Sequence, residues 1–230
     1  MNDFLEESLF FGAFITIFAY SAGILLKRKF KRALFNPLLI AMVLIIAVLS
    51  TFKIDYGTYG KGASYISFLL TPATVCLAVP LYRQLLLLRK HALAIFCGIL
   101  AGVITNAVLV LSLSALLGLE HVQYVTLLPK SVTTPIGMGI SEEIGGMASI
   151  TAAVIVITGV LGNLMAEFLF RIFRIKEDVA KGIALGSASH VVGTAKAMEM
   201  GEIQGAISGL SIVVSGLLTV VAAPIFAAFY

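Results

Sequence analysis

Two stretches of the chain combine hydroxyl side chains with a basic residue inside otherwise apolar sequence. The first stretch, residues 122–143, holds Lys130 between two prolines that are six residues apart. The second stretch, residues 182–202, holds His190 among glycines and serines. Hydroxyls, a lysine and exposed backbone amides are groups that bind a small anion, and a histidine can carry a proton near neutral pH. Together the two stretches predict an anion-binding site.

In the first stretch, Pro129 and Pro135 predict a broken helix, because each proline removes a backbone donor. Lipid cannot satisfy the backbone groups that a break frees, so a break at membrane depth must face protein or water. A lysine at that depth is costly and usually functional. The alternative is a proline-kinked helix whose hydroxyls bond the freed carbonyls. The candidate substrate-binding residues here are Lys130, Ser131, Thr133 and Thr134.

In the second stretch, small residues allow backbones to approach a ligand closely. The candidate substrate-binding residues are Ser187, Ser189, His190 and Thr194, and His190 is also the candidate proton-coupling residue. The alternative for His190 is a hydrogen bond between two helices. Four further residues are candidate charge partners: Glu142, Glu143, Lys196 and Glu199. Lys196 and Glu199 are three residues apart, so they can instead pair with each other.

No catalytic pattern accompanies these residues. Zinc-ligand spacing and a phosphate-binding loop are missing, and no aspartate in a predicted span completes a triad with Ser189 and His190. Both cysteines, Cys76 and Cys97, lie in apolar runs, where unpaired buried thiols are expected. The sequence therefore predicts a protein that is not an enzyme and uses no cofactor or metal.

The composition indicates an integral membrane protein. The chain has 230 residues, of which 60% are hydrophobic and 12% are charged, and its mean hydropathy is +1.05. Soluble domains carry about 25% charged residues. This composition excludes a disordered chain, a collagen-like fibre and a disulfide framework. The net charge of +4 does not indicate nucleic-acid binding, because the basic residues lie between apolar runs and form no stripe.

Charge-free runs predict six spans, since a helix needs about 20 apolar residues to cross the membrane. The runs are residues 8–26, 33–52, 62–82, 92–119, 144–166 and 203–230. The start of the chain lacks the basic region of a cleaved signal peptide, so its first helix is expected to be retained. We expect an all-α, polytopic membrane helix bundle that forms a single membrane domain. Residues 1–119 are the expected scaffold, and residues 120–230 form the expected substrate-binding units.

The basic loops predict the orientation. The loops after the first, third and fifth spans hold five, three and four basic residues, twelve of the sixteen in the chain. Basic loops remain on the cytoplasmic side, so the N-terminus is expected outside. All three loops reach the cytoplasm only if residues 122–143 enter and leave the membrane on its outer side. Residues 182–202 then form a second re-entrant hairpin from the inner side. The alternative is eight plain spans with one misplaced basic loop.

The two polar stretches also resemble an inverted repeat. The sequence from Glu143 to Gly146 matches that from Glu202 to Gly205 at an offset of 59 residues. Because the two hairpins start on opposite sides, a twofold axis in the membrane plane would relate them, as in many transporters. Two further groups of small or polar residues predict packing seams on helix faces: Gly98, Gly102 and Asn106, and Gly159, Gly162 and Asn163.

The chain resembles the LrgB/CidB family of bacterial inner-membrane proteins. The resemblance rests on residues 36–39, 71–82, 128–135 and 186–197, and the run from Pro129 to Pro135 is highly specific. It implies an antiholin-like regulator of murein hydrolase activity that acts with a small LrgA/CidA-like membrane protein. It also implies a link to small carboxylates, since relatives are implicated in moving pyruvate, glycolate and glycerate. Glu142 and Glu143 depart from the small residues typical of the family at that point.

Two functions are therefore expected. The first is a secondary carrier for a small monocarboxylate, which works with the LrgA/CidA-like partner and affects autolysis indirectly. The alternative is an antiholin-like modulator that controls a holin-like pore without transporting anything itself. The two interrupted, hydroxyl-lined stretches with Lys130 and His190 favour the carrier, because a packing module does not need them. A homodimer is a further expected assembly, and no nucleic-acid partner is expected.

Overall fold

The computed structural model describes residues 10–30, 37–69, 72, 76, 78–83 and 85–230. Every element among these residues is a helix, and this part of the chain has no strand. The all-α prediction is therefore confirmed for the residues described. The chain divides into two compact units, Met1–Cys76 and Leu77–Tyr230. The predicted retained helix at the start of the chain lies partly outside the described residues.

The first unit contains α2 (Phe11–Phe30), α3 (Pro37–Phe52) and α4 (Tyr56–Phe68). α2 packs on both other helices through glycines. The backbone of Gly12 lies against Tyr59, and the backbone of Gly23 lies against Pro37, with no room for a side chain at either position. The Asp55 carboxylate begins α4 by accepting a hydrogen bond from the N–H of Gly57 at 2.6 Å.

In the part of the chain that the structure describes, four helices are long and apolar enough to cross a membrane: α2, α8 (Ala92–Leu117), α11 (Ala148–Ile172) and α13 (Glu202–Ala227). They correspond to four of the six predicted spans. Within the predicted span 33–52 the structure describes the 16-residue α3, and the start of that span lies outside the described residues. In the predicted span 62–82, α4 begins before the span, at Tyr56 after its Asp55 cap, and ends at Phe68, while α6 (Ala78–Arg83) follows. Residues 70–71, 73–75 and 77 lie outside the described residues. Counting charge-free residues cannot detect such a cap.

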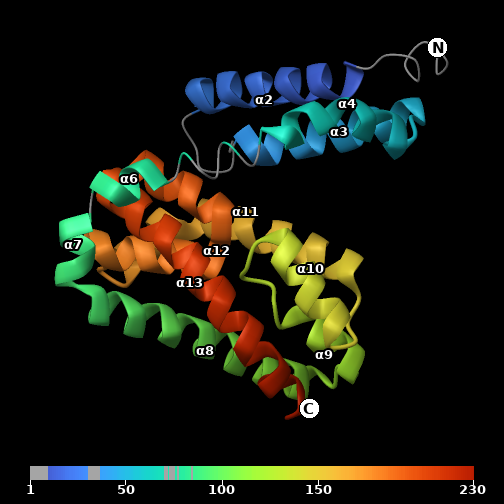
Figure 1. The fold of residues 1–230 in the computed structure, drawn as a ribbon. Helices are drawn as coiled ribbons and strands as arrows, with labels where there is room; N and C mark the ends of the chain where they lie inside the picture. The colour runs from blue at the N-terminus through green and yellow to red at the C-terminus, as the bar shows by residue number, and fades with distance from the viewer. Residues whose placement is uncertain (1–9, 31–36, 70–71, 73–75, 77, 84) are drawn as a thin grey trace. The chain divides into compact units, whose positions relative to one another are not determined.

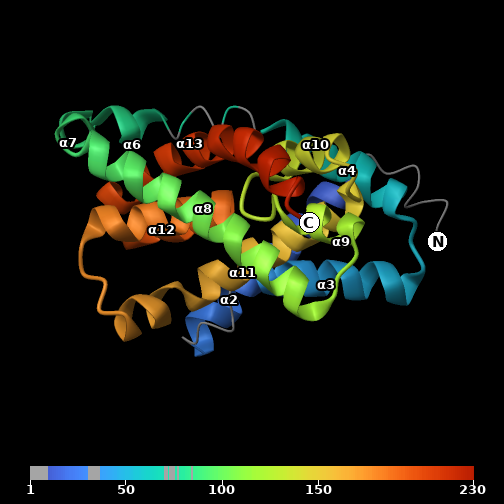
Figure 2. The ribbon, with the colours of Figure 1, turned by 90° about the horizontal axis from the view of Figure 1, so that it is seen from below.

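In the second unit, the short helices α6 (Ala78–Arg83) and α7 (Leu85–Lys90) lead into α8. α8 packs on α13 through a buried cluster of Ile95, Ile99 and Ile207. The short α9 (His121–Leu127) lies beside the C-terminal end of α13 (Figures 1 and 2). There the Tyr124 hydroxyl donates a hydrogen bond to the carbonyl of Phe226 at 2.8 Å.

The long helices of the second unit turn apolar side chains outward and small polar side chains inward. Leu113 and Leu116 on α8 are exposed, as are Leu217 and Val221 on α13. The opposite face of α13 buries four hydroxyls, those of Ser208, Ser211, Ser215 and Thr219. An apolar exterior around a hydroxyl-rich interior is typical of helix packing in membranes.

The first polar stretch folds back on itself. α9, residues 128–133 and α10 (Thr134–Glu143) form a helical hairpin that leads into α11. After α10 the chain has returned to α9, since the N–H of Met147 donates to the Thr126 hydroxyl at 2.9 Å. The Thr151 hydroxyl donates to the carbonyl of Thr126 at 2.9 Å and fastens α11 to the same point.

The second polar stretch also folds back, within α12 (Asp178–Met200). Ser189 (φ −129°, ψ 15°) and His190 (φ 42°, ψ −136°) leave the helical conformation and divide α12 into two arms, residues 178–188 and 191–200. The backbone of Gly193 lies against the carbonyl of Leu185. In a straight helix, eight residues span about 12 Å, so this contact requires the second arm to turn back along the first.

Candidate functional site

The first helix break is held by α8. In a continuous helix the carbonyl of Leu128 would accept from the N–H of Val132, but that N–H donates instead to the carbonyl of Pro129 at 3.3 Å. The side-chain amide of Asn106 on α8 donates to the Leu128 carbonyl at 3.1 Å. A side chain from a neighbouring helix therefore satisfies the carbonyl that the break frees.

Lys130 is connected to the same asparagine. The Ser131 hydroxyl donates to Oδ1 of Asn106 at 3.2 Å, and Nζ of Lys130 donates to the Ser131 hydroxyl at 3.3 Å. Ser131 is buried and Lys130 is half-buried. Among the residues that the structure describes, Lys130 forms no ion pair. A half-buried ammonium group without a carboxylate partner can attract an anion.

The second break is held by α11. His190 is buried, and its Nε2–H donates to the carbonyl of Ile155 at 2.9 Å. This is the hydrogen bond between helices that the alternative interpretation of His190 predicts, and proton coupling stays a prediction. Two glycines of α11 make room for the break, because a side chain at Gly159 would meet the His190 ring at 2.7 Å and one at Gly162 would overlap Ser189.

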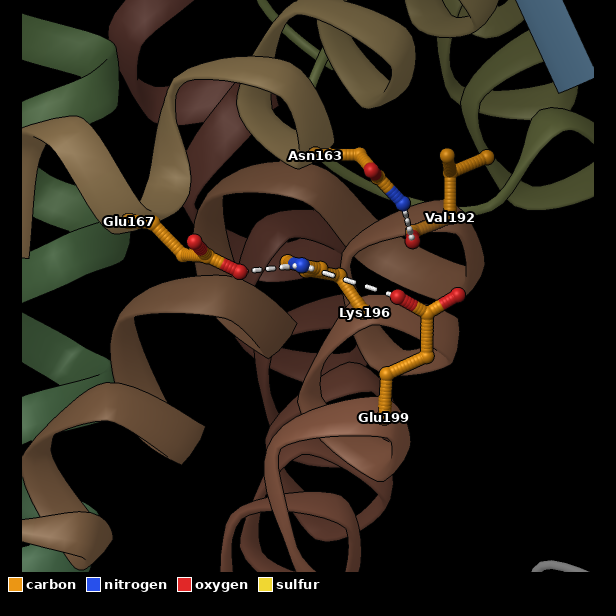
Figure 3. A network of polar contacts seen from close by, with 5 residues as sticks. All are labelled: Asn163, Glu167, Val192, Lys196 and Glu199. Carbon is orange, nitrogen blue, oxygen red and sulfur yellow. Dashed lines mark hydrogen bonds and ion pairs between the residues drawn. The ribbon is translucent and has the colours of Figure 1, made fainter. Parts of the chain in front are cut away.

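The second arm of α12 has a further connection to α11, as Figure 3 shows. The Asn163 amide donates to the carbonyl of Val192 at 3.1 Å. Lys196 lies between two carboxylates, with Nζ 2.5 Å from Glu167 of α11 and 3.5 Å from Glu199. The pairing of Lys196 with Glu199 that their spacing predicts is therefore confirmed. The charge of Lys196 is balanced within the protein.

The structure brings the two breaks together across α8 and α11. The side chain of Ile155 lies against the backbone of Gly137 in α10, while its carbonyl accepts from His190. On α8, Gly102 lies against the Ser187 hydroxyl, and Asn106, one turn later, binds Ser131. Each of these two helices thus contacts both hairpins within about one turn, a rise of roughly 6 Å.

The remaining candidate residues have different surroundings. The buried Thr194 hydroxyl is hydrogen-bonded to the Ser208 hydroxyl of α13 at 2.7 Å, and the Ser187 hydroxyl donates to its own helix at the carbonyl of Ile183. Thr133 and Thr134 are half-buried at the beginning of α10, where the first N–H groups of a helix point toward the break. The structure therefore brings Lys130, Ser131, Thr133 and Thr134 together at the first break. Thr194 is instead hydrogen-bonded to α13.

The candidate charge partners on α10 do not neutralise Lys130. Glu142 and Glu143 lie exposed in the last turn of α10. Within the described part of the chain, neither forms an ion pair with Lys130. The same residues contain no cluster of three or more His, Cys, Asp or Glu side chains that could hold a metal ion.

Two residues of this site were expected only to pack. Asn106 and Asn163 belong to the predicted small-residue seams, yet each donates its amide to a backbone carbonyl at or beside a break. The sequence contained a signal for this role of the two asparagines. An amide group in an apolar span is costly unless it is hydrogen-bonded, and the broken stretches are where backbone acceptors become available.

Comparison with known proteins gives one consistent result. The model of the LrgB-like family matches residues 16–229. Relatives from Bacillus mycoides (strain KBAB4), Bacillus cereus (strain B4264) and Bacillus anthracis (strain CDC 684 / NRRL 3495) are each named "Antiholin-like protein LrgB". Each is 37% identical to this chain over 221 residues, which cover 96% of both proteins. No solved structure matches the chain.

Proposed function

The chain belongs to the LrgB-like family, and on that premise we propose two alternative functions. One is a secondary carrier whose two helix breaks bind a small monocarboxylate and carry it across the membrane. The other is an antiholin-like modulator that controls a holin-like pore without transporting anything itself. The resemblance drawn from the sequence is confirmed at the level of the family. The proposal has two parts, an antiholin-like role and a carrier activity, and different observations support them.

The names of the relatives support the antiholin-like role, and they favour it over the carrier. In this role the protein modulates a holin-like pore, formed by a small LrgA/CidA-like membrane protein, and thereby regulates murein hydrolase activity. It requires a packing surface for that partner and no ligand site.

One observation carries the proposed anion site: Lys130 is half-buried at a helix break, donates to the Ser131 hydroxyl, and forms no ion pair within the described residues. The second break is different, since its cation Lys196 is already paired with Glu167 and Glu199. An unpaired cation at membrane depth is costly, and a carboxylate ligand would offset that cost.

We propose that both hairpins are re-entrant. α9 has 7 residues and α10 has 10. Each arm of α12 is also at most about 17 Å long, well short of a hydrocarbon core roughly 30 Å thick. Short arms that fold back support hairpins that enter and leave on one side. With α8, α11 and α13 as full spans, the N-terminus is proposed to lie outside the bacterial inner membrane and the basic loop before α12 inside.

The proposed ligand lies between the hairpins. Its carboxylate is bound by Lys130, Ser131, Thr133 and Thr134, and its other end meets Ser187, Ser189 and His190. Because Nε2 of His190 donates to Ile155, Nδ1 is the atom that would take up a coupled proton. Glycines beside both breaks let backbone groups approach a ligand of about three heavy atoms.

Uptake of labelled pyruvate into liposomes separates the two parts of the proposal. The purified chain is tested alone and together with an LrgA/CidA-like protein. The carrier predicts saturable uptake that requires this chain and is lost in Lys130→Ala. The modulator predicts no saturable uptake in any sample, while the chain alters leakage through the partner's pore. Absence of uptake from every sample containing active partner would refute the carrier.

A labelling experiment tests the proposed topology. With Cys76 and Cys97 replaced, single cysteines are introduced by Gly57→Cys and Lys176→Cys and treated with a membrane-impermeant thiol reagent from outside. The proposed arrangement predicts labelling at position 57 and protection at position 176. Labelling at 176 from outside would replace the first hairpin by a plain span.

A further inference from the structure

A similar short sequence, identical at three of five positions, occurs on the two helices that hold the breaks. Residues 102–106 of α8 read Gly-Val-Ile-Thr-Asn, and residues 159–163 of α11 read Gly-Val-Leu-Gly-Asn. Each asparagine donates its side-chain amide to a backbone carbonyl of the hairpin that follows, at 3.1 Å in both cases. The two asparagines are 57 residues apart, whereas their acceptors, Leu128 before the first break and Val192 after the second, are 64 residues apart.

The helices that follow repeat at the same offset. α9 begins at His121 and α12 begins at Asp178, while α10 ends at Glu143 and α12 ends at Met200. The second arm of α12, from residue 191, corresponds likewise to α10, from residue 134. The sequence match at an offset of 59 pairs Glu143, the last residue of α10, with Glu202, the first residue of α13, so it does not pair equivalent elements.

Each copy also contacts the hairpin of the other, although at positions that are not equivalent within the two hairpins. Gly98 of α8 lies against Ile183 in the second hairpin, and its counterpart at the 57-residue offset, Ile155 of α11, lies against Gly137 in the first hairpin. Each long helix therefore holds its own hairpin through asparagine and supports the other hairpin about two turns earlier.

We propose that Asn106 and Asn163 are equivalent positioning residues, each of which holds the broken helix of its own hairpin in two copies of one structural unit, residues 92–143 and 148–200. The unit consists of a long helix followed by a hairpin. This register pairs α8 with α11 and leaves α13 outside the repeat as the helix that both hairpins pack against.

The consequence for ligand binding rests on the proposed function. Asn106 accepts from Ser131, and Ser131 accepts from Lys130, so Asn106 determines where the Lys130 amine lies. Asn163 holds the second arm at Val192. Asn106 therefore positions the residue that binds the anion, whereas Asn163 positions the opposite wall.

Hydrogen exchange of the purified full-length chain tests the proposal without depending on transport. In Asn106→Ala, amides of residues 127–133 are expected to exchange about tenfold faster, with residues 187–194 unchanged. In Asn163→Ala the pattern is expected to reverse. Thr219→Val is the matched control, because Thr219 is also buried and its hydroxyl donates within its own helix, to the carbonyl of Ser215. This variant is expected to leave amide exchange unchanged at both breaks.

Two exchange results would overturn the proposal. Unchanged exchange at both breaks would show that the asparagines do not hold them. Equal acceleration of both breaks in each variant would show that each asparagine does not serve its own hairpin. If the wild-type chain takes up no pyruvate, the carrier function fails while the exchange result still decides this proposal.

Uptake kinetics test the positioning of Lys130. In Asn106→Ala the KM for pyruvate is expected to rise severalfold with Vmax within about twofold, because the cation is displaced rather than removed. A loss of Vmax at unchanged KM, with normal protein abundance, would contradict this positioning role.

Discussion

The two helix breaks of the second unit are built in different ways. The first lies between prolines and spans residues 128–133, with α8 satisfying the freed carbonyl of Leu128. The second contains no proline or glycine at its centre and is confined to Ser189 and His190, with His190 at a positive φ of 42°. It depends on α11, where Gly159 and Gly162 make room for it.

The charges at the breaks differ as well. Lys196 beside the second break is bound by two carboxylates, and only 15% of its side chain is exposed. Lys130 at the first break contacts a hydroxyl and no carboxylate among the described residues. In the proposed carrier, the first break therefore binds the anion and the second break forms the opposite wall.

The largest effect is expected from Lys130. Lys130→Ala is expected to lower pyruvate uptake about a hundredfold or more, because it removes the one unpaired cation at the breaks. Lys130→Arg is expected to retain partial uptake, since a guanidinium keeps the charge and changes its shape. The measurement is initial uptake rate in liposomes that contain equal amounts of protein.

The matched control is Lys196→Met, which removes a cation of similar depth that already has partners. Its uptake is expected to remain within about twofold of wild type, with at most a small loss of stability, since an exposed or partly exposed ion pair contributes about 0–1 kcal/mol. If Lys196→Met abolishes uptake and Lys130→Ala does not, the assignment of the two breaks is reversed.

A smaller effect is expected from the glycines of α11. Gly162→Ala places a methyl group on Ser189, and such overpacking costs about 1–3 kcal/mol. The thermal midpoint of the purified protein is therefore expected to fall by roughly 2–12 °C. Gly209→Ala on α13 is the control, because nothing lies within 4 Å of the added carbon. Its midpoint should hold or rise slightly, as alanine favours helix. Equal midpoints for the two variants would show that the second break does not depend on the space at Gly162.

The smallest effect is expected at His190. Replacement by alanine and by glycine both remove the hydrogen bond to Ile155, but only glycine adopts a positive φ without strain. His190→Gly is therefore expected to be more stable than His190→Ala by about 1 kcal/mol, or 2–4 °C in thermal midpoint. Ala195→Gly in the second arm is the control. In an ordinary helix glycine is less stabilising than alanine, so this variant is expected to be less stable than wild type. If His190→Ala is the more stable variant, the backbone at this break is not strained.

The sequence predicted the first break better than the second. Proline acts through its own ring and its missing N–H, so Pro129 and Pro135 mark a break locally. At Ser189 and His190 the composition indicated close backbone approach, but the position of the turn is determined by α11, about 30 residues earlier in the chain. Such a contact cannot be derived from the local sequence.

The predicted helix boundaries also differ in how well they agree with the structure. The predicted boundaries of α8, α11 and α13 are close to those observed, because these helices are long apolar runs. α4 begins before its predicted span because the Asp55 side chain caps its start, which is a capping effect rather than a hydropathy effect. Asn106 and Asn163 were assigned to packing because their acceptors are created only when the hairpins fold.

Equilibrium binding of labelled pyruvate to the purified chain is the most direct test that the breaks form one anion site centred on Lys130. The expected result is saturable binding that is lost in Lys130→Ala, retained within about twofold in Lys196→Met, and weakened when Ser189 of the opposite hairpin is replaced by a bulkier residue such as leucine. Binding that is unaffected by Lys130→Ala, or saturable binding that depends on Lys196 alone, would contradict the account.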